Sequence, residues 1–524
     1  MPLWLHIGSA GVLVLGAWLL PRHVAGARAI KWPAAALDIA PVALATLLLL
    51  VATGRPLFTG VVLLALGAGL ALADWAKRDA LKEPVVFSDM SELPQVFTHP
   101  QLYLPFAGPG LVIGGAMATI VVAIGLLVLE TPLTAPAPFS AVIIALVLCA
   151  IGWAVSREPL LSALARVLRR LGPSGDPFAD ASRLGPFTTL YAFGVIARAE
   201  RNERRSRHRP AAPAIIEARP GSAGPIVMVQ CESFFDARRL APQLPADLLP
   251  GFDACCAAGA AFGRLDVSGW GANTMRTEFA ALTGIADCDL GYDRFNPYHA
   301  FARVPVASLA WKLRALGYRT LCLHPFDRRF FRRDLTLPAL GFDLFRDGAN
   351  LRTSRRPPYC SDPELARHVL RTLEAEGPQT FVFAITMGNH GPWHGSWHGA
   401  GPAIDAGIPR QLDASEVPQS GDLLRYLDGL CRSDEMLQIL TEGLERRGDG
   451  GILAFYGDHL PSLPRAFRHF GFDEWSTDYV LWPGCARPAQ RLDLPAHGLA
   501  ALVLDRRRSG GGIATAPALA EGAA

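Results

Sequence analysis

The nine-residue stretch ILAFYGDHL (452–460) decides how the second half of this 524-residue chain is interpreted. Apolar residues dominate 452–456, as in the buried strands of a parallel sheet, and Gly457 then allows a sharp turn. Asp458 and His459 follow directly, so a carboxylate and an imidazole lie at the carboxyl end of a predicted strand. This edge of an α/β sheet is where sites are built, and an Asp-His pair can bind a divalent metal.

Three further predicted strands in the same half of the chain end in matching chemistry. They cover 225–233, 319–324 and 380–390, and their ends carry Glu232, His324, and Asn389 with His390. Helices are predicted at about 303–316, 362–376 and 421–446, which completes the alternating pattern of an α/β domain. One polar strand end is ordinary, whereas four that carry Glu, His, His and Asp-His favour a shared site.

The segment SGWGANTMRTEFAALTG (268–284) joins a glycine-rich turn to a helix predicted to begin near Thr274. A hydroxyl at that position is often only a helix cap. The alternative is that Thr274 acts as a nucleophile. A threonine hydroxyl needs a metal or a base for this, and a divalent cation held by the strand-end ligands would promote loss of its proton and polarise a phosphoryl oxygen. The helix N-terminus also favours an anionic group. Thr277 competes for the same role.

The N-terminal part contains five apolar stretches with almost no charge, at about 3–20, 37–53, 57–75, 106–129 and 139–155. Each is long enough to cross a hydrocarbon core of about 30 Å. Buried core helices are a poor alternative, since the apolar segment 111–129 has no polar face. We therefore expect a transmembrane domain with about five helices over 1–156. The first stretch is not expected to be a removable signal, because it lacks a basic start and a clear cleavage site.

Three segments are expected after the transmembrane domain. Residues 157–222 are rich in arginine and predict a basic amphipathic linker, which would suit anionic headgroups. A nucleic-acid role is not expected, because the net charge is only +3 and no recognition motif accompanies the arginines. Residues 223–505 predict one globular domain and 506–524 a disordered tail. No cysteine pair has the CxxC spacing of a zinc finger.

The motifs QCESF, GANTMRTEF, GYRTLCLHPFDRRFFRRD, NHGPW and YGDH together resemble the lipoteichoic acid synthase family. Its members are membrane-anchored phosphoglycerol transferases of the alkaline phosphatase and sulfatase superfamily. The resemblance covers essentially the whole chain, and implies an N-terminal α-helical transmembrane bundle followed by an α/β sulfatase-like catalytic domain. It assigns a metal to Glu232, Thr274, Asp458 and His459, with Thr274 also the nucleophile. It assigns the substrate phosphate to His324, Arg333 and His390.

Two positions depart from the family pattern. The tryptophan expected between the substrate-binding histidine and arginine is Phe331, and the residue before His390 is Asn389 instead of serine. Both departures concern the substrate and leave the metal and the nucleophile intact. The additional histidines of HGPWHGSWH (390–398) are more simply explained as loop surface than as an acceptor groove.

The resemblance implies an enzyme that moves phosphoglycerol from phosphatidylglycerol to a glycan or polymer acceptor of the cell envelope. Diacylglycerol would leave, and a phosphothreonine would form at Thr274. The mainly oxygen ligand set suits Mn²⁺ best and also accommodates Mg²⁺ or Zn²⁺. A phosphoethanolamine transferase or a sulfatase-like phosphoester hydrolase is the first alternative. A formylglycine sulfatase is not expected, because the CxPxR context is absent. An inactive membrane sensor or scaffold is the second alternative, and retention of all four metal residues argues against it.

The charge distribution disagrees with the localisation that the resemblance implies. Ten lysines and arginines flank the predicted spans on the side of the catalytic domain, and only Arg55 flanks them on the other side. The positive-inside rule would therefore place the catalytic domain in the cytoplasm. Members of the family need it outside, so we expect a multi-pass protein of a bacterial inner membrane with an extracytoplasmic catalytic domain.

Overall fold

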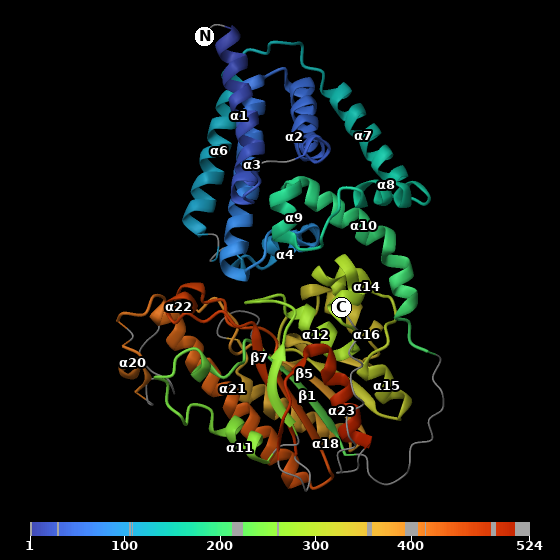
Figure 1. Cartoon of the computed structure of the whole chain (residues 1–524), viewed down its shortest axis with the longest axis vertical. Coiled ribbons are helices and arrows are strands. Elements are labelled where there is room, and N and C mark those ends of the chain that lie inside the picture. Colours follow the sequence, from blue (N-terminus) through green and yellow to red (C-terminus); the bar gives the residue numbers. More distant parts are fainter. Residues whose placement is uncertain are drawn as a thin grey trace. The chain divides into compact units, whose positions relative to one another are not determined.

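The structure, a computed structural model, describes residues 3–28, 31–103, 106, 108–211, 224–258, 261–353, 359–393, 407–413, 415–483 and 489–508. Contacts divide the chain into two compact units (Figure 1). The first comprises Met1–Glu203 with Gly291–Phe295, and the second Arg204–Leu290 with Asn296–Ala524. The predicted boundaries at 156, 222 and 505 stay predictions. The end of the predicted linker from 212 and the predicted tail from 509 lie outside the described residues.

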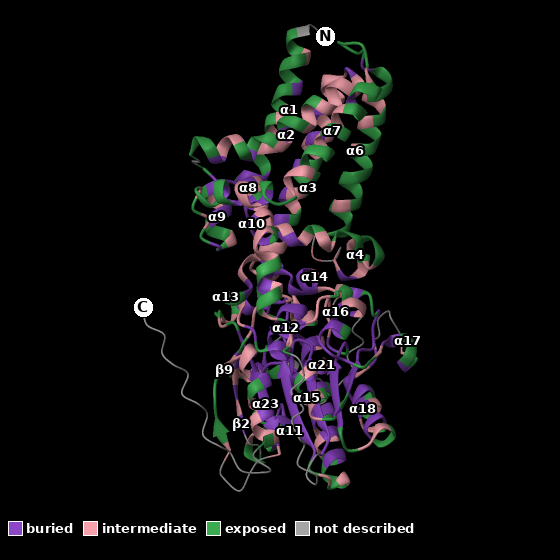
Figure 2. Cartoon of the chain, turned by 90° about the vertical axis from the view of Figure 1, so that its right-hand side faces the viewer, coloured by how far each residue is buried: buried purple, intermediate pink, exposed green. Residues whose placement is uncertain are grey.

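Among the described residues of the first unit, five helices are long and apolar enough to cross a membrane: α1 (Leu3–Val24), α2 (Trp32–Thr53), α3 (Pro56–Leu81), α6 (Pro109–Leu129) and α7 (Pro138–Val155). The five predicted apolar stretches are thus confirmed as helices. Figure 2 shows α6 and α7 largely exposed, and α6 buries none of its residues. Short helices η1 (Phe87–Ser91), α4 (Leu93–Thr98) and η2 (Pro100–Leu102) lie between α3 and α6.

Much of the predicted basic linker is helical and packed within the first unit. It forms α8 (Leu160–Arg169), α9 (Pro177–Leu184) and α10 (Pro186–Arg207). Asp38 of α2 is fully buried and accepts hydrogen bonds from the amides of Phe187 and Thr188, at the N-terminus of α10. The same carboxylate pairs with Arg22 of α1 at 3.0 Å. A carboxylate at this position satisfies amides that have no partner within the helix and complements its dipole.

The second unit is built on one nine-stranded sheet of order β4-β3-β5-β1-β6-β7-β2-β8, with β9 paired to β2. The strands are β1 (Ile226–Cys231), β2 (Ala261–Asp266), β3 (Arg319–Leu323), β4 (Leu344–Arg346), β5 (Thr380–Ile385), β6 (Ile452–Gly457), β7 (Ser476–Trp482), β8 (Gln490–Arg491) and β9 (Leu494–Pro495). Strands β4, β3, β5, β1 and β6 run parallel, and β7 is antiparallel to both neighbours. The four predicted strands are confirmed as β1, β3, β5 and β6.

Helices cover both faces of the sheet (Figure 1). One face packs α11 (Pro250–Ala258), α18 (Asp362–Glu376), α21 (Ser420–Arg447) and α22 (Pro464–His469). The other packs α12 (Thr274–Thr283), α14 (Pro297–Phe301), α15 (Leu309–Ala315), α16 (Arg333–Ala339) and α23 (Leu499–Arg508). Shorter helices of the chain are η3 (Ala237–Arg239), α13 (Asp287–Leu290), η4 (Gly291–Phe295), η5 (Phe330–Arg332), α17 (Gly348–Leu351), α20 (Ile408–Gln411) and η6 (Ala496–Gly498).

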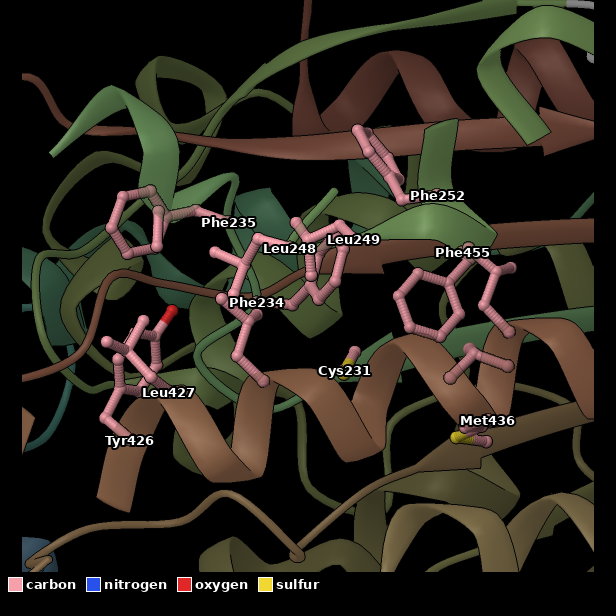
Figure 3. Packing of buried hydrophobic residues seen from close by; sticks show 14 of the residues in the cluster. Cys231, Phe234, Phe235, Leu248, Leu249, Phe252, Tyr426, Leu427, Met436 and Phe455 are labelled. Atoms are coloured by element: carbon pink, nitrogen blue, oxygen red, sulfur yellow. The ribbon is translucent and has the colours of Figure 1, made fainter. Parts of the chain in front are cut away.

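The alternation of side chains along β1 explains why both faces need cover. Val227 and Val229 belong to one core cluster, and Ile226 and Met228 to the other. Figure 3 shows the first cluster, in which Phe234 packs edge-on against Phe252 and Phe455 at ring-centroid distances of 5.5 and 5.0 Å. Because four neighbouring strands run parallel, their carboxyl ends meet at one edge of the sheet.

Candidate metal and phosphate site

Three of the predicted metal ligands lie together at the carboxyl edge of the sheet. Glu232 follows β1, and Asp458 and His459 follow β6, which pairs with β1 through Cys231 and Gly457. One ligand atom of each lies within 4.8 Å of the others. Nε2 of His459 is 3.3 Å from Oε1 of Glu232 and 3.3 Å from Oδ2 of Asp458. The ends of β1 and β6 therefore bring these three side chains together.

Gly457 has a different role from the predicted one. It is the last residue of β6 and not part of a turn. A Cβ atom at this position would collide with the backbone carbonyl of Phe234. Glycine is needed because the chain that follows β1 passes directly over the end of β6.

The ligand cluster fits a divalent cation. Oδ2 of Asp458 is buried and accepts no hydrogen bond from any described residue. A buried carboxylate oxygen that accepts no well-formed hydrogen bond is costly unless a positive charge compensates it, and His459 at 3.3 Å is its neighbour within the cluster. Burial, and then the charge of Glu232, raise the pKa of Asp458. Burial lowers the pKa of His459, but the two carboxylates outweigh this effect and raise it overall. A cation bound by the three residues would relieve the repulsion between the carboxylates.

Thr274 joins this cluster from α12. Its Oγ1 lies 3.3 Å from Nε2 of His459. The N-cap of α12 is Asn273, so Thr274 is the first helical residue and not the cap. Thr277, the competing candidate, donates its hydroxyl hydrogen to the backbone carbonyl of Asp458 at 2.8 Å. Thr277 thus holds the loop after β6, and Thr274 is the threonine at the ligand cluster.

Ser233 orients two of the ligands and was missed in the sequence. Its amide donates to Oδ1 of Asp458 at 2.9 Å, and its hydroxyl donates to Oε1 of Glu232 at 2.9 Å. The hydroxyl of Tyr426 in turn donates to the carbonyl of Ser233 at 2.9 Å. The available signal was its place in QCESF, directly after a predicted ligand.

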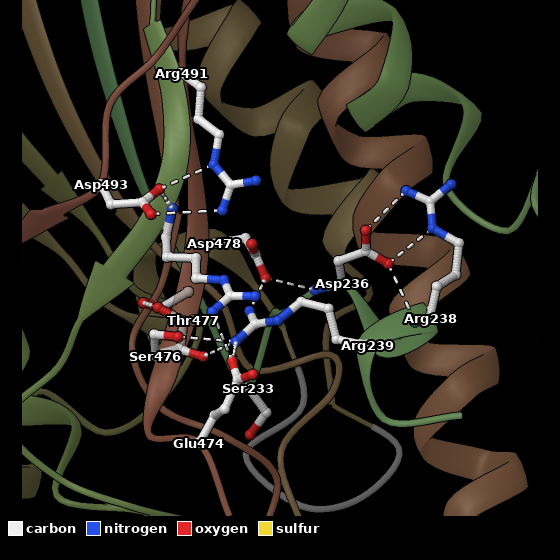
Figure 4. A network of polar contacts seen from close by, with 12 residues as sticks. Ser233, Asp236, Arg238, Arg239, Glu474, Ser476, Thr477, Asp478, Arg491 and Asp493 are labelled. Carbon is white, nitrogen blue, oxygen red and sulfur yellow. Dashed lines mark hydrogen bonds and ion pairs between the residues drawn. The ribbon is translucent and has the colours of Figure 1, made fainter. Parts of the chain in front are cut away.

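A further polar network fixes the loop that follows these residues (Figure 4). The carboxylate of Asp478 on β7 accepts from the amide of Asp236 at 2.8 Å and from Nη1 of Arg239 at 2.7 Å. Nη2 of Arg239 reaches Glu474 at 2.6 Å. These contacts tie the loop after β1 to β7, which helps to hold Glu232 and Ser233 in place.

His324 and Arg333 lie together and bind each other. Nη1 of Arg333 donates to Nε2 of His324 at 3.1 Å. Nδ1 of His324 faces the carbonyl of Ile385 at 3.3 Å and therefore carries the hydrogen. Burial, and then the charge of Arg333, hold the pKa of His324 well below its usual value, so the ring is neutral.

Glu278 organises this pair and was also missed. Nε and Nη2 of Arg333 donate to its two oxygens at 3.2 and 2.7 Å. The carboxylate also accepts from the hydroxyl of Tyr298, and from Nε2 of Gln230 at 3.1 Å. Glu278 lies one helical turn after Thr274, so the network connects α12 to the predicted phosphate ligands. Arg333 has five N–H groups, of which these bonds use three.

Aromatic residues connect His324 to His390. The ring of Phe326 lies 6.2 Å from that of His324 and 5.9 Å from that of Tyr359, which lies 6.2 Å from the ring of His390. Burial, and then the charge of Glu232, raise the pKa of Tyr359 to about 12. Nδ1 of His390 donates to the carbonyl of Gly391. Of the additional histidines, His394 and His398 lie outside the described residues.

The two positions that depart from the family pattern both contact groups of the site region. Phe331 lies against Arg333, whose guanidinium carbon is 5.4 Å from the ring centroid. Asn389 is buried, and its Oδ1 accepts from Nε1 of Trp393 at 3.0 Å. Its Nδ2 is buried and bonds to no described residue. The predicted phosphate-binding roles of His324, Arg333 and His390 stay predictions.

Comparisons with known proteins agree with this geometry. The family model described as Sulfatase matches residues 226–491, more than half of the chain. The capsular polysaccharide biosynthesis protein RkpI of Rhizobium meliloti is 33% identical over 264 residues, which are 49% of this chain and 45% of the relative. A putative cyclic β-1,2-glucan modification protein of the same organism is 29% identical over 249 residues, which are 47% of this chain and 37% of the relative. The chain thus spans less than half the length of these curated relatives.

One solved structure resembles nearly the whole chain. The integral membrane lipooligosaccharide phosphoethanolamine transferase A (EptA) of Neisseria meningitidis is 13% identical, with a TM-score of 0.55 and coverage of 94% of both chains. At this identity the likeness concerns the fold, including the N-terminal helices. The expected architecture of apolar helices followed by an α/β sulfatase-like domain is thereby confirmed. The chain belongs to the Sulfatase family, within the alkaline phosphatase and sulfatase superfamily.

Proposed function

We propose that this chain is a membrane-anchored, metal-dependent phosphotransferase that moves phosphoglycerol from phosphatidylglycerol to a glycan or polymer acceptor of the cell envelope. The observation that carries the proposal is the position of the Thr274 hydroxyl, 3.3 Å from His459 in the ligand cluster. Membership of the Sulfatase family supports ester transfer, and the motif resemblance supports the lipid donor. The names of the two Rhizobium relatives support a glycan acceptor.

The proposed reaction proceeds in two displacements at phosphorus. The oxygen of Thr274 forms a bond to phosphorus while the bond to the diacylglycerol oxygen breaks, and that oxygen leaves with a proton. An acceptor hydroxyl then attacks the phosphothreonine, loses its proton and restores Thr274. A bound divalent cation, for which Mn²⁺ is the best fit and Mg²⁺ or Zn²⁺ are alternatives, would supply Lewis-acid polarisation and lower the pKa of the hydroxyl.

The chain's own groups would stabilise the negative charge that develops on the phosphoryl oxygens. Thr274 begins α12, so backbone amides and the helix dipole are directed at an anion bound there. Arg333 keeps two N–H groups that Glu278 and His324 do not use. Nδ1 of His390 bonds to the carbonyl of Gly391, which leaves Nε2 to contact the substrate. Donor and leaving group are both lipids, which fits the five apolar helices of a multi-pass inner-membrane protein with an extracytoplasmic site.

The test uses the full chain in liposomes that contain phosphatidylglycerol labelled in its headgroup. We expect the wild type to release diacylglycerol and to form a labelled protein adduct, and Thr274→Ala to lose both. Thr283→Ala, at the far end of the same helix, is the matched control and should retain both. Undiminished release by Thr274→Ala would refute the mechanism. Release from phosphatidylethanolamine in place of phosphatidylglycerol would favour the phosphoethanolamine transferase.

A further inference from the structure

Helix α8 carries two apolar strips, of which only one is covered. The covered strip consists of Leu161, Ala165 and Leu168. Ala165 and Leu168 pack in one cluster with residues of α10. The second strip is Leu160 and Val167, which lie on one face seven positions apart and are 51% and 55% exposed. An amphipathic helix of a water-facing surface normally presents polar residues outside its buried face.

Three arginines accompany the exposed strip. Arg166 lies on α8, Arg170 caps the C-terminus of the helix one turn later, and both are exposed. Arg157 precedes the helix, with its guanidinium carbon 4.5 Å from the ring centroid of Trp153 at the end of α7. None of the three forms an ion pair with a described acidic residue, whereas Arg169 pairs with Glu200 at 2.7 Å. The surface therefore combines apolar side chains with three guanidinium groups that form no ion pair among the described residues, although the exposed Glu158 lies next to Arg157.

Helix α18 provides an internal comparison from the second unit. It also buries one apolar face, formed chiefly by Leu365, Ala366, Val369 and Leu373. Its exposed charged positions have both signs, and they are Glu364, Arg367, Arg371 and Glu374. No large apolar residue of α18 is exposed. This is the pattern of a helix that faces water. In contrast, the exposed charged residues of α8 are arginines alone, and two of its large apolar residues are exposed.

We propose that the surface formed by Leu160, Val167, Arg157, Arg166 and Arg170 binds the headgroups of anionic phospholipids at the membrane surface. Helix α8 directly follows α7, the fifth helix able to span the bilayer, so the chain delivers it to the interface. Apolar side chains would enter the boundary of the acyl chains while the guanidinium groups bind lipid phosphates. If the chain has the proposed function, this surface would enrich the anionic donor phosphatidylglycerol around the protein relative to zwitterionic phosphatidylethanolamine.

The same surface offers a reason for the unusual charge distribution. Arg157, Arg166 and Arg170 are three of the ten cationic residues that the positive-inside rule would place in the cytoplasm. Binding to an anionic donor lipid gives them a function on the extracytoplasmic side. The position of these three arginines then follows from substrate supply and not from orientation.

The test measures lipid selectivity without transfer. The full chain is reconstituted in phosphatidylcholine, and electron spin resonance compares the association of spin-labelled phosphatidylglycerol and phosphatidylcholine with the protein. We expect the wild type to prefer phosphatidylglycerol, and high salt to weaken the preference. The triple variant R157Q/R166Q/R170Q should lower it by about two- to fivefold. The matched triple variant R367Q/R371Q/R432Q, which removes exposed arginines of the second unit, should leave it unchanged.

An unchanged preference in R157Q/R166Q/R170Q would overturn the proposal. If that variant does not assemble, R166Q and R170Q are measured singly, and a partial loss in each supports the proposal while no loss in either overturns it. The measurement does not depend on catalysis. A wild type that selects phosphatidylglycerol yet releases no diacylglycerol would refute the proposed transfer and leave the lipid-binding surface intact.

Discussion

Removing both members of the buried pair Glu278–Arg333 should destabilise the second unit by less than the sum of the two single removals. The side chains are 0% and 2% exposed and 2.7 Å apart, so water screens their charges very little. Either substitution alone leaves an uncompensated buried charge or a buried donor without a partner. We expect Glu278→Gln or Arg333→Met to lower the free energy of unfolding by about 3–5 kcal/mol each. The double variant should cost less than the sum, by about 1–3 kcal/mol.

The assay is urea unfolding of the detergent-solubilised chain, followed by tryptophan fluorescence, for the wild type and the three variants. Diacylglycerol release is measured on the same samples. The double variant should lose less stability than the two single losses added together, yet it should show no recovery of release, because Arg333 would be missing from the proposed phosphate site. This combination separates the structural role of the pair from its proposed role in binding phosphate.

The control is the exposed pair Glu442–Arg446, whose side chains are 64% and 70% exposed and 3.7 Å apart. Glu442→Gln and Arg446→Met should each change stability by less than about 0.5 kcal/mol. Costs that simply add in the Glu278/Arg333 double variant would refute the reasoning, since the two groups would then not stabilise each other.

Three further predictions concern protonation, metal and topology. Burial raises the pKa of Asp362 from 3.8 to about 6. The protonated carboxyl group therefore contributes to the free energy of unfolding below about pH 4, and this contribution is lost as the pH rises through 6. In urea unfolding, the free energy of unfolding of Asp362→Asn minus that of the wild type should therefore increase by about 2 kcal/mol between pH 4 and pH 7. A difference that stays constant with pH would contradict this prediction. MnCl₂ at 100 times its Kd should stabilise the wild type by about 2.7 kcal/mol in thermal unfolding. Asp458→Asn should abolish this shift, and an equal shift in the variant would exclude the ligand cluster as the binding site. A reporter that is active only outside the cytoplasm should be active when it is fused after Arg508. Activity of a reporter that works only in the cytoplasm would refute the proposed orientation.

The sequence identifies the central strands because they are buried on both faces. Residues 226–231, 380–385 and 452–457 are buried throughout, and such strands are nearly continuous apolar runs. Strands β2 and β7 escape prediction for a different reason. AFGRLD contains glycine, arginine and aspartate, and STDYVLW begins with three polar residues, so neither has a clear strand pattern. Their pairing with each other, over a separation of more than 200 residues, stabilises them as strands.

The three residues of the ligand cluster are predictable because they lie directly after β1 and β6, whereas the groups that orient them are not. Glu278 reaches Arg333 across 55 positions, and Ser233 reaches Asp458 across 225. No local pattern marks such contacts. The sequence also does not predict the backbone conformation beside the site. Four non-glycine residues there have positive φ: Ser233, Asn273, Phe331 and Arg332. Surrounding contacts must impose these costly conformations, which concentrate at functional sites.

The balance of charge at the site supports transfer of a phosphodiester over hydrolysis of a phosphomonoester. Glu278 neutralises Arg333 within the protein, and the neutral His324 adds no charge. A divalent cation would be neutralised by Glu232 and Asp458, the carboxylates of the ligand cluster found among the described residues. The site would therefore meet the substrate with little net positive charge. A diester such as phosphatidylglycerol brings one negative charge, which the N-terminus of α12 and the remaining N–H groups of Arg333 can stabilise. A monoester dianion would bring a second negative charge, which neither Arg333, already paired with Glu278, nor a cation neutralised by Glu232 and Asp458 would balance.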